Sequence, residues 1–158
     1  MAEVQELSRA TYDRLKSELE ELTGEGRIDI AHKIEAARAL GDLSENGDYH
    51  AAKEQQGKME ARIRQITGTL LDAVVVEVDA ADTSRVVVGT VVALRFAGDD
   101  DVERFLVGNI EERHDDLEVL SPKSPLGQAV VGASAGEHRT YEVNGNHLGI
   151  EIVSIEAS

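Results

Sequence analysis

The spacing of apolar residues changes near residue 75, and this change constrains the fold more than any other feature of the chain. Up to about Val74, leucine and isoleucine recur at steps of three and four, the spacing of one helix face. Two runs carry this pattern: Leu15, Leu19 and Leu22, and then Met59, Ile63, Ile66 and Leu70. Beyond it, short runs rich in valine and isoleucine alternate with Gly, Asp and Asn, which is typical of strands joined by turns. We therefore expect a helical region followed by a small sheet.

The helical region is expected to contain two long amphipathic helices, at about residues 9–41 and 46–73. Ser8 offers a hydroxyl that can cap the first helix. Because the joining segment 41–47 is short and polar, the simplest arrangement is an antiparallel hairpin in which each apolar stripe covers the other. At 1.5 Å per residue the hairpin would be a rod of about 50 Å. The Gly-Glu-Gly interruption at residues 24–26 predicts a kink or fraying, because glycine weakens helices.

The region after residue 75 is expected to form a small antiparallel sheet. Its strands are predicted at residues 74–78, 86–94, 105–110, 140–143 and 148–155. Residues 124–132 begin with Ser-Pro and end with Gly, which suits one short helix. The predicted fold class is α+β: a long antiparallel α-helical coiled-coil hairpin followed by a small antiparallel-sheet domain with one short helix.

The predicted domain boundaries follow the same change of pattern. The hairpin is expected at residues 1–78, with an acidic tip at 42–48. A short polar linker is expected at 79–84, and the sheet domain at 85–158.

Composition excludes several functional classes. The chain has 16 Lys and Arg against 31 Asp and Glu, a formal net charge of −15, so most of its surface should repel nucleic acid and anionic lipid. It has no cysteine, which excludes disulfides, thiolate zinc sites, iron–sulfur clusters and cysteine nucleophiles. With no long uncharged apolar stretch, we expect a cytoplasmic protein without membrane contact. The remaining chemistry must use carboxylate, imidazole or hydroxyl groups.

The segment between the two helices carries Asp42, Glu45 and Asp48 at three-residue intervals. One interpretation is structural: Asp42 caps the second helix, Glu45 completes a capping box, and Asn46 with Gly47 makes a turn. The other is a Mg²⁺ site, because Mg²⁺ is commonly held by one or two protein carboxylates together with water and the phosphates of a substrate. Such a site would be incomplete alone, so a partner would have to supply further ligands. Spacing leaves both interpretations open.

Two segments resemble a known family. The run from Ala36 to Gln56, AARALGDLSENGDYHAAKEQQ, closely resembles the tip signature of the bacterial Gre-type transcription elongation factors, GreA and GreB. The run SPLGQAVVG at residues 124–132 is similar to the FKBP-like C-terminal domain of that family. The resemblance covers nearly the whole chain and implies a coiled-coil hairpin followed by an FKBP-like domain that docks on RNA polymerase.

The resemblance also implies a function. Such a factor binds the secondary channel of RNA polymerase and stimulates the polymerase's own cleavage of a backtracked transcript, so that it assists an enzyme without being one. Its partners would be RNA polymerase and the backtracked RNA 3′ end within the complex, and the factor itself would be a monomer. No cofactor would be bound stably, because the Mg²⁺ would be shared with the polymerase active site.

The resemblance assigns roles to particular residues. Asp42 and Glu45 occupy the tip positions whose carboxylates assist catalysis in trans and help hold the second Mg²⁺ and a water molecule. Ser44 and Asn46 match neighbouring tip positions, where each could contact the polymerase or equally cap the second helix.

The resemblance also implies a docking loop in the sheet domain, and alternative functions remain open. Ser124 and Pro125 match the polymerase-docking loop, although a Ser-Pro helix start is also ordinary structure. The main alternative is a protein of the same fold that occupies the channel and inhibits or modulates the polymerase without stimulating cleavage. A plain coiled-coil interaction module and an autonomous nuclease are more distant alternatives.

Overall fold

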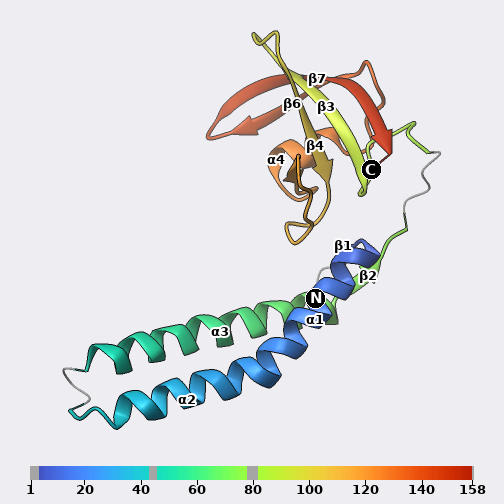
Figure 1. Cartoon of the computed structure of the whole chain (residues 1–158). Helices are drawn as coiled ribbons and strands as arrows, with labels where there is room; N and C mark the ends of the chain where they lie inside the picture. Colours follow the sequence, from blue (N-terminus) through green and yellow to red (C-terminus); the bar gives the residue numbers. More distant parts are fainter. Residues whose placement is uncertain (1–3, 43–45, 78–81, 158) are drawn as a thin grey trace. The chain divides into compact units, whose positions relative to one another are not determined.

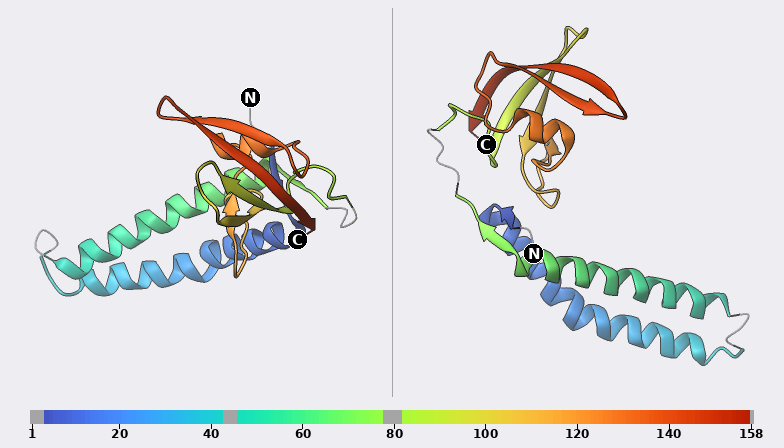
Figure 2. Two further views of the ribbon diagram at one scale, coloured as in Figure 1. Left: turned by 90° about the horizontal axis from the view of Figure 1, so that it is seen from above. Right: turned by 180° about the vertical axis from the view of Figure 1, so that it is seen from behind.

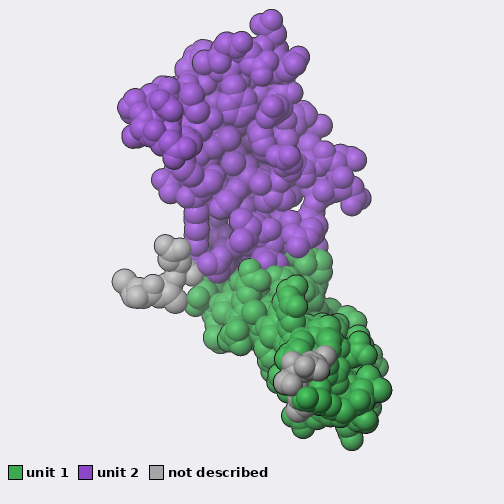
Figure 3. Space-filling view, turned by 90° about the vertical axis from the view of Figure 1, so that its left-hand side faces the viewer, with its two compact units in different colours: residues 1–3, 12–73 green, residues 4–11, 74–158 purple. Residues whose placement is uncertain are grey.

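The computed structural model describes residues 4–42, 46–77 and 82–157 (Figure 1). Contacts within the chain divide it into two compact units, which Figure 3 colours separately. The helical unit contains residues 12–73, and the sheet unit contains residues 4–11 and 74–158. The first residues of the described chain therefore belong to the sheet unit. None of the helices in the described ranges is both long and apolar enough to cross a membrane.

The helical unit is the predicted hairpin, which the structure confirms (Figures 1 and 2). Its elements are α1 (Arg9–Glu21), the π-helical turn η1 (Leu22–Gly26), α2 (Arg27–Arg38) and α3 (Gly47–Leu71). The predicted interruption at residues 24–26 lies inside η1. Helix α2 ends at Arg38, earlier than expected, and Gly41 then adopts a φ of 123°, which only glycine tolerates readily.

A narrow apolar seam joins the two arms of the hairpin. Its buried residues are Leu15, Ile30 and Ala37 from the first arm and Ala52, Ile63 and Ile66 from α3. The predicted stripes therefore supply much of this seam, with Leu19, Leu22, Met59 and Leu70 half-buried at its margins. Because alanines face the tip end of the seam, the two helices need little side-chain volume between them there.

The sheet unit contains a five-stranded sheet in the order β5-β4-β3-β7-β6. Its strands are β3 (Thr90–Phe96), β4 (Val102–Val107), β5 (Glu118–Leu120), β6 (His138–Val143) and β7 (Asn146–Ala157). The pairings are antiparallel except for β4 with β5, which is parallel and was not predicted. A separate two-stranded sheet pairs β1 (Gln5–Leu7) with β2 (Ala73–Val75).

Two predicted strands are displaced. The strand expected at residues 105–110 lies at Val102–Val107. The strand expected at residues 86–94 begins at Thr90, because Val86 is fully buried through a loop contact, with its amide donating to the Ala133 carbonyl at 2.9 Å. The predicted short helix is confirmed as α4 (Pro125–Val130). It contributes to the main core, which comprises Val86, Val92, Leu94, Phe105, Val107, Leu120, Val130, Ala133, Ile150 and Ile152.

Candidate functional site

The hairpin tip lies between the end of α2 and the start of α3 (Figure 1). Asp42 is exposed there, a few residues beyond the last turn of α2. Ser44 and Glu45 lie outside the described residues, so their assigned roles stay predictions. Asp48 is exposed in the first turn of α3. The described part of the tip thus carries two exposed carboxylates on either side of residues 43–45.

Asn46 is the N-cap of α3, in an extended conformation with φ −86° and ψ 99°. Its Oδ1 accepts a hydrogen bond from the Tyr49 amide at 3.0 Å, and its Nδ2 donates to the Ala37 carbonyl at 2.5 Å. One side chain therefore satisfies an amide at the start of α3 and a carbonyl near the end of α2. The prediction that Asn46 could cap the second helix is confirmed, whereas the interpretation that gave this cap to Asp42 is wrong.

A ring contact adds to this connection. The Tyr49 and His50 rings meet edge to face, with centroids 5.7 Å apart. The Arg38 guanidinium lies 5.9 Å from the centroid of the Tyr49 ring, within the range of a cation–π interaction. Arg38 is the last residue of α2, so this contact and the Asn46 cap both tie the end of α2 to the start of α3. The two helix ends that flank Asp42 are held together by side chains of the chain itself.

A shallow apolar groove runs along the hairpin behind the tip. It has a volume of about 420 Å³ and is lined by residues that include Lys33, Ala36, Leu40, Asp48 and Ala51. Leu40 is 70% exposed, which is high for a leucine. The side chains next to the acidic tip therefore offer apolar surface as well as charge.

The second predicted site lies at the start of α4. Ser124 is the N-cap: its Oγ accepts from the Gly127 amide at 3.0 Å and donates to the Ser121 carbonyl at 2.7 Å. Pro125 follows as the first helical residue and is exposed. Within this loop Ser124 holds the backbone, whereas Pro125 presents its ring at the surface. Any contact of either residue with a partner stays a prediction.

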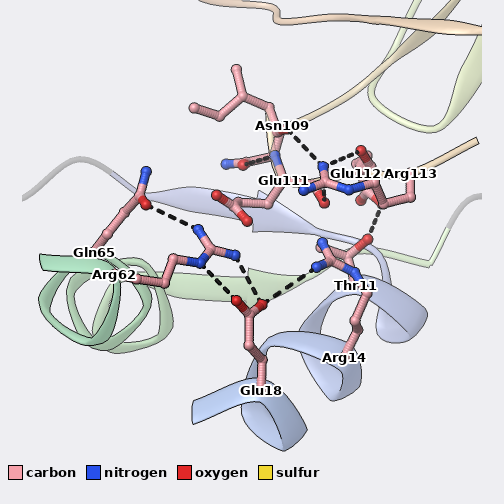
Figure 4. Close-up of polar contacts among 10 residues, drawn as sticks. Thr11, Arg14, Glu18, Arg62, Gln65, Asn109, Glu111, Glu112 and Arg113 are labelled. Carbon is pink, nitrogen blue, oxygen red and sulfur yellow. Dashed lines mark hydrogen bonds and ion pairs between the residues drawn. The ribbon is translucent and has the colours of Figure 1, made fainter. Parts of the chain in front are cut away.

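Two bidentate ion pairs cross between the arms of the hairpin. Arg62 on α3 donates to both oxygens of Glu18 at 2.8 and 2.9 Å, and Glu18 also faces Arg14 at 3.7 Å (Figure 4). Arg27 on α2 donates to both oxygens of Glu60 at 2.9 and 3.0 Å. The hydrogen bond and charge of Arg27 lower the pKa of Glu60 below its ordinary value, and those of Glu60 raise the pKa of Arg27.

The sheet unit contains one polar contact that sequence reasoning missed. Glu112 is only 8% exposed, and its carboxylate accepts hydrogen bonds from the Ser8 amide and the Ser8 hydroxyl, each at 2.8 Å. It also accepts from the Thr11 hydroxyl (Figure 4). Ser8 is at the same time the predicted cap of α1, since its Oγ accepts from the Thr11 amide at 3.2 Å. The cap had a local sequence signal, but its distant partner Glu112 had none.

Among the residues that the structure describes, no three His, Asp or Glu side chains are grouped as a metal site would require. Asp42 nevertheless has the right chemistry for Mg²⁺, because an exposed carboxylate is a hard oxygen ligand that can join a coordination shell completed by others.

These features define a class of protein: a long helical hairpin with carboxylates at its tip, followed by a small sheet domain. Two family models match the chain, "Transcription elongation factor, N-terminal" over residues 5–75 and "Transcription elongation factor, GreA/GreB, C-term" over residues 81–157. The chain belongs to the GreA/GreB family of transcription elongation factors, as its resemblance to that family had predicted.

Two GreA proteins agree with this assignment. The chain is 48% identical to transcription elongation factor GreA of Streptomyces coelicolor over 152 residues, which cover 95% of this chain and 92% of that protein. It is 49% identical to the GreA of Streptomyces avermitilis, with the same coverage. Among solved structures, it is 23% identical to the GreA factor homolog 1 (Gfh1) protein of Thermus thermophilus, with 98% of this chain and 99% of that chain covered and a TM-score of 0.45.

Proposed function

We propose that this protein binds RNA polymerase through the secondary channel and stimulates the polymerase's own cleavage of a backtracked transcript. The observation that carries the proposal is the exposed Asp42 at the far end of a GreA/GreB-family hairpin. The N-cap of α3 is Asn46 and not Asp42. The protein is a cofactor of the polymerase in this proposal and has no nuclease activity of its own.

The chemical role of the tip is to donate ligands. In the proposal, the carboxylates of Asp42 and Glu45 hold the more weakly bound Mg²⁺ of the polymerase active site and orient a water molecule toward the scissile phosphate. A second Mg²⁺ in such a site stabilises charge on the attacking and leaving oxygens. The Asn46 cap and the Arg38–Tyr49 contact support this role because they fix the two helix ends that flank this segment of the chain.

The sheet unit is proposed to dock on the polymerase through the loop that holds Ser124 and Pro125. Ser124 fixes the loop backbone through its bonds to Ser121 and Gly127, so that Pro125 is presented in one conformation. A preformed contact of this kind loses less conformational entropy on binding. Ser44 and Asn46 are proposed as further tip contacts.

The test uses stalled, backtracked polymerase complexes that carry a 3′-labelled transcript and Mg²⁺. The double variant Asp42→Asn/Glu45→Gln should lose cleavage stimulation by about 100-fold or more, because each change removes a charged ligand while keeping its shape. Asp48→Asn is the matched control: it removes one charge from an exposed aspartate of the same tip and should cleave almost as well as the unchanged protein. Binding is measured in parallel by competition for the polymerase.

The outcomes separate the proposal from its alternatives. Retained binding with lost cleavage supports the ligand-donor role of Asp42 and Glu45. Binding without cleavage by the unchanged protein would make it a channel-occupying modulator instead. Cleavage of naked RNA without polymerase would indicate an autonomous nuclease.

A further inference from the structure

The seam of the hairpin has a different period on its two arms. On α3 the buried and half-buried positions of the seam alternate steps of four and three, at Ala52, Gln56, Met59, Ile63, Ile66 and Leu70. This is the seven-residue repeat of a regular coiled coil, which keeps one face of a slightly supercoiled helix on its partner. Within α3, the seam needs no irregularity.

The first arm departs from this repeat by one residue. Its seam positions are Leu15, Leu19, Leu22, Gly26, Ile30, Ile34 and Ala37, with steps of four, three, four, four, four and three. A regular repeat continued beyond Gly26 would reach Asp29, Lys33 and Ala36, and all three are exposed. Each seam position beyond Gly26 therefore comes one residue later than the repeat allows. The first arm contains one residue more than a coiled coil of this length requires.

The extra residue is accommodated by η1. A π-helical turn closes its hydrogen bonds over five residues instead of four, so it takes up one additional residue without interrupting the helix. Because η1 spans Leu22–Gly26, the regular repeat holds before it and, displaced by one, again after it. In Figure 1 the axis of α1 runs at an angle to that of α2, and η1 lies between them.

The turn is open to solvent on one side and contacts α3 on the other. It contains no buried residue, and a Cβ at Gly24 would meet nothing within 4 Å. Gly26 faces the thioether of Met59, where a Cβ would lie 3.2 Å from the sulfur. Close to Met59 on α3 is Gly57, around which a Cβ would also find nothing within 4 Å. Both arms therefore carry glycine near this level, and the contact between them is a flexible methionine.

The two bidentate ion pairs flank η1 on the first arm. On the first arm Glu18 precedes η1 and Arg27 follows it, whereas their partners on α3, Arg62 and Glu60, are two residues apart and both follow Met59. Paired guanidinium and carboxylate groups fix the orientation as well as the distance of the helices that carry them. The two ion pairs therefore join the first arm, on either side of η1, to one short stretch of α3.

We propose that η1 is a hinge created by a single inserted residue, about which the tip half of the hairpin bends relative to the base half, while the two ion pairs keep the first arm joined to α3 on either side of η1. Bending at this level would carry Asp42 sideways without opening the seam. The inference concerns the hairpin alone and does not depend on the proposed function, since its tests need no polymerase.

Two single-residue deletions test the insertion. Deletion of Gly24 should convert η1 into ordinary α-helix and restore the seven-residue repeat, so the full-length variant should keep its helical circular dichroism and its Tm within a few degrees. Deletion of Gly57 is the matched control: it removes the same residue type near the same level, but α3 has no spare residue. The seam from Met59 to Leu70 would rotate away by about 100°, and Tm should fall by about 10 °C. Equal losses in both deletions would overturn the inference.

Distance measurements test the bending. The chain has no cysteine, so Lys16→Cys with Glu35→Cys places spin labels at two exposed positions on either side of η1, about 28 Å apart along the helix. The distribution of distances should be broad with the insertion present and narrower after deletion of Gly24. Gly24→Ala, which keeps the insertion, should leave it broad. Equal widths with and without the insertion would overturn the hinge.

Discussion

The helical unit buries its apolar side chains along one narrow seam, whereas the sheet unit buries them in a core built from four strands, α4 and the loops between them. In the hairpin, small and half-buried residues meet across the seam, and the exposed glycines Gly24, Gly57 and Gly68 outside the seam have open space around them. In the sheet unit, Gly127 has none. An exposed glycine of the hairpin therefore lowers the stability of its helix and can be replaced by alanine, whereas Gly127 is required because a side chain at its position would clash.

The largest expected effect comes from exchanging these two kinds of glycine for alanine. A Cβ on Gly127 would lie 1.9 Å from the Ser121 carbonyl oxygen, so Gly127→Ala must displace backbone and should lower the free energy of unfolding by about 3 kcal/mol or more. Gly68→Ala on α3 meets no atom within 4 Å and should raise it by about 0.5–1 kcal/mol. Urea denaturation followed by circular dichroism measures both; effects of the same sign would remove the contrast.

The same comparison shows what the sequence could predict. The hairpin and its apolar stripes could be predicted because a helical period is visible in residues that are close together in the sequence. The Gly-Glu-Gly interruption correctly indicated the position of η1. The true start of β3 could not be predicted, because Val86 resembles a strand residue yet reaches the core from a loop. The strand β5, which pairs in parallel with β4, was not predicted either. The proposed roles of Asp42 and Glu45 came from the family resemblance, since spacing alone favoured a capping role.

The contact between Ser8 and Glu112 shows why the rest escaped prediction. The two residues are 104 positions apart, and nothing around Glu112 marks it as a buried acceptor. A carboxylate in an acidic loop is ordinarily solvated, and only the fold brings the first turn of α1 to it. Local patterns predicted the cap at Ser8 and could not predict what the cap itself contacts.

Replacing Glu112 should have an intermediate effect. Glu112→Gln keeps the shape of the side chain but replaces one acceptor oxygen with an amide group and removes the charge that strengthens the bonds from Ser8 and Thr11. We expect a loss of about 2 kcal/mol in the free energy of unfolding of the sheet unit. Glu118→Gln on β5, an exposed position, should change it little. Equal urea midpoints for the two variants would show that the Glu112 contact adds no stability.

The smallest effects concern two exposed ion pairs, one in each unit. Arg27 lowers the pKa of Glu60 in the hairpin, and in the sheet unit Glu137 has its pKa lowered first by Arg139 and then by the Ser134 amide. A carboxyl group with a lowered pKa contributes stability above its ordinary pKa, and that contribution is lost as the pH falls through the lowered value. Both contributions should therefore disappear on acidification.

The two pairs should respond differently when the arginine is removed. In Arg27→Met, Glu60 loses its main partner, so its pKa should return almost to the ordinary value. In Arg139→Met, Glu137 still accepts from the Ser134 amide at 3.1 Å, so its pKa should return only part of the way. Added salt should likewise raise the pKa of Glu60 more than that of Glu137, because salt screens charges and leaves a backbone hydrogen bond in place. Carboxyl chemical shifts followed by NMR during acid titration measure both values, and a full return for Glu137 would mean that the backbone amide contributes nothing.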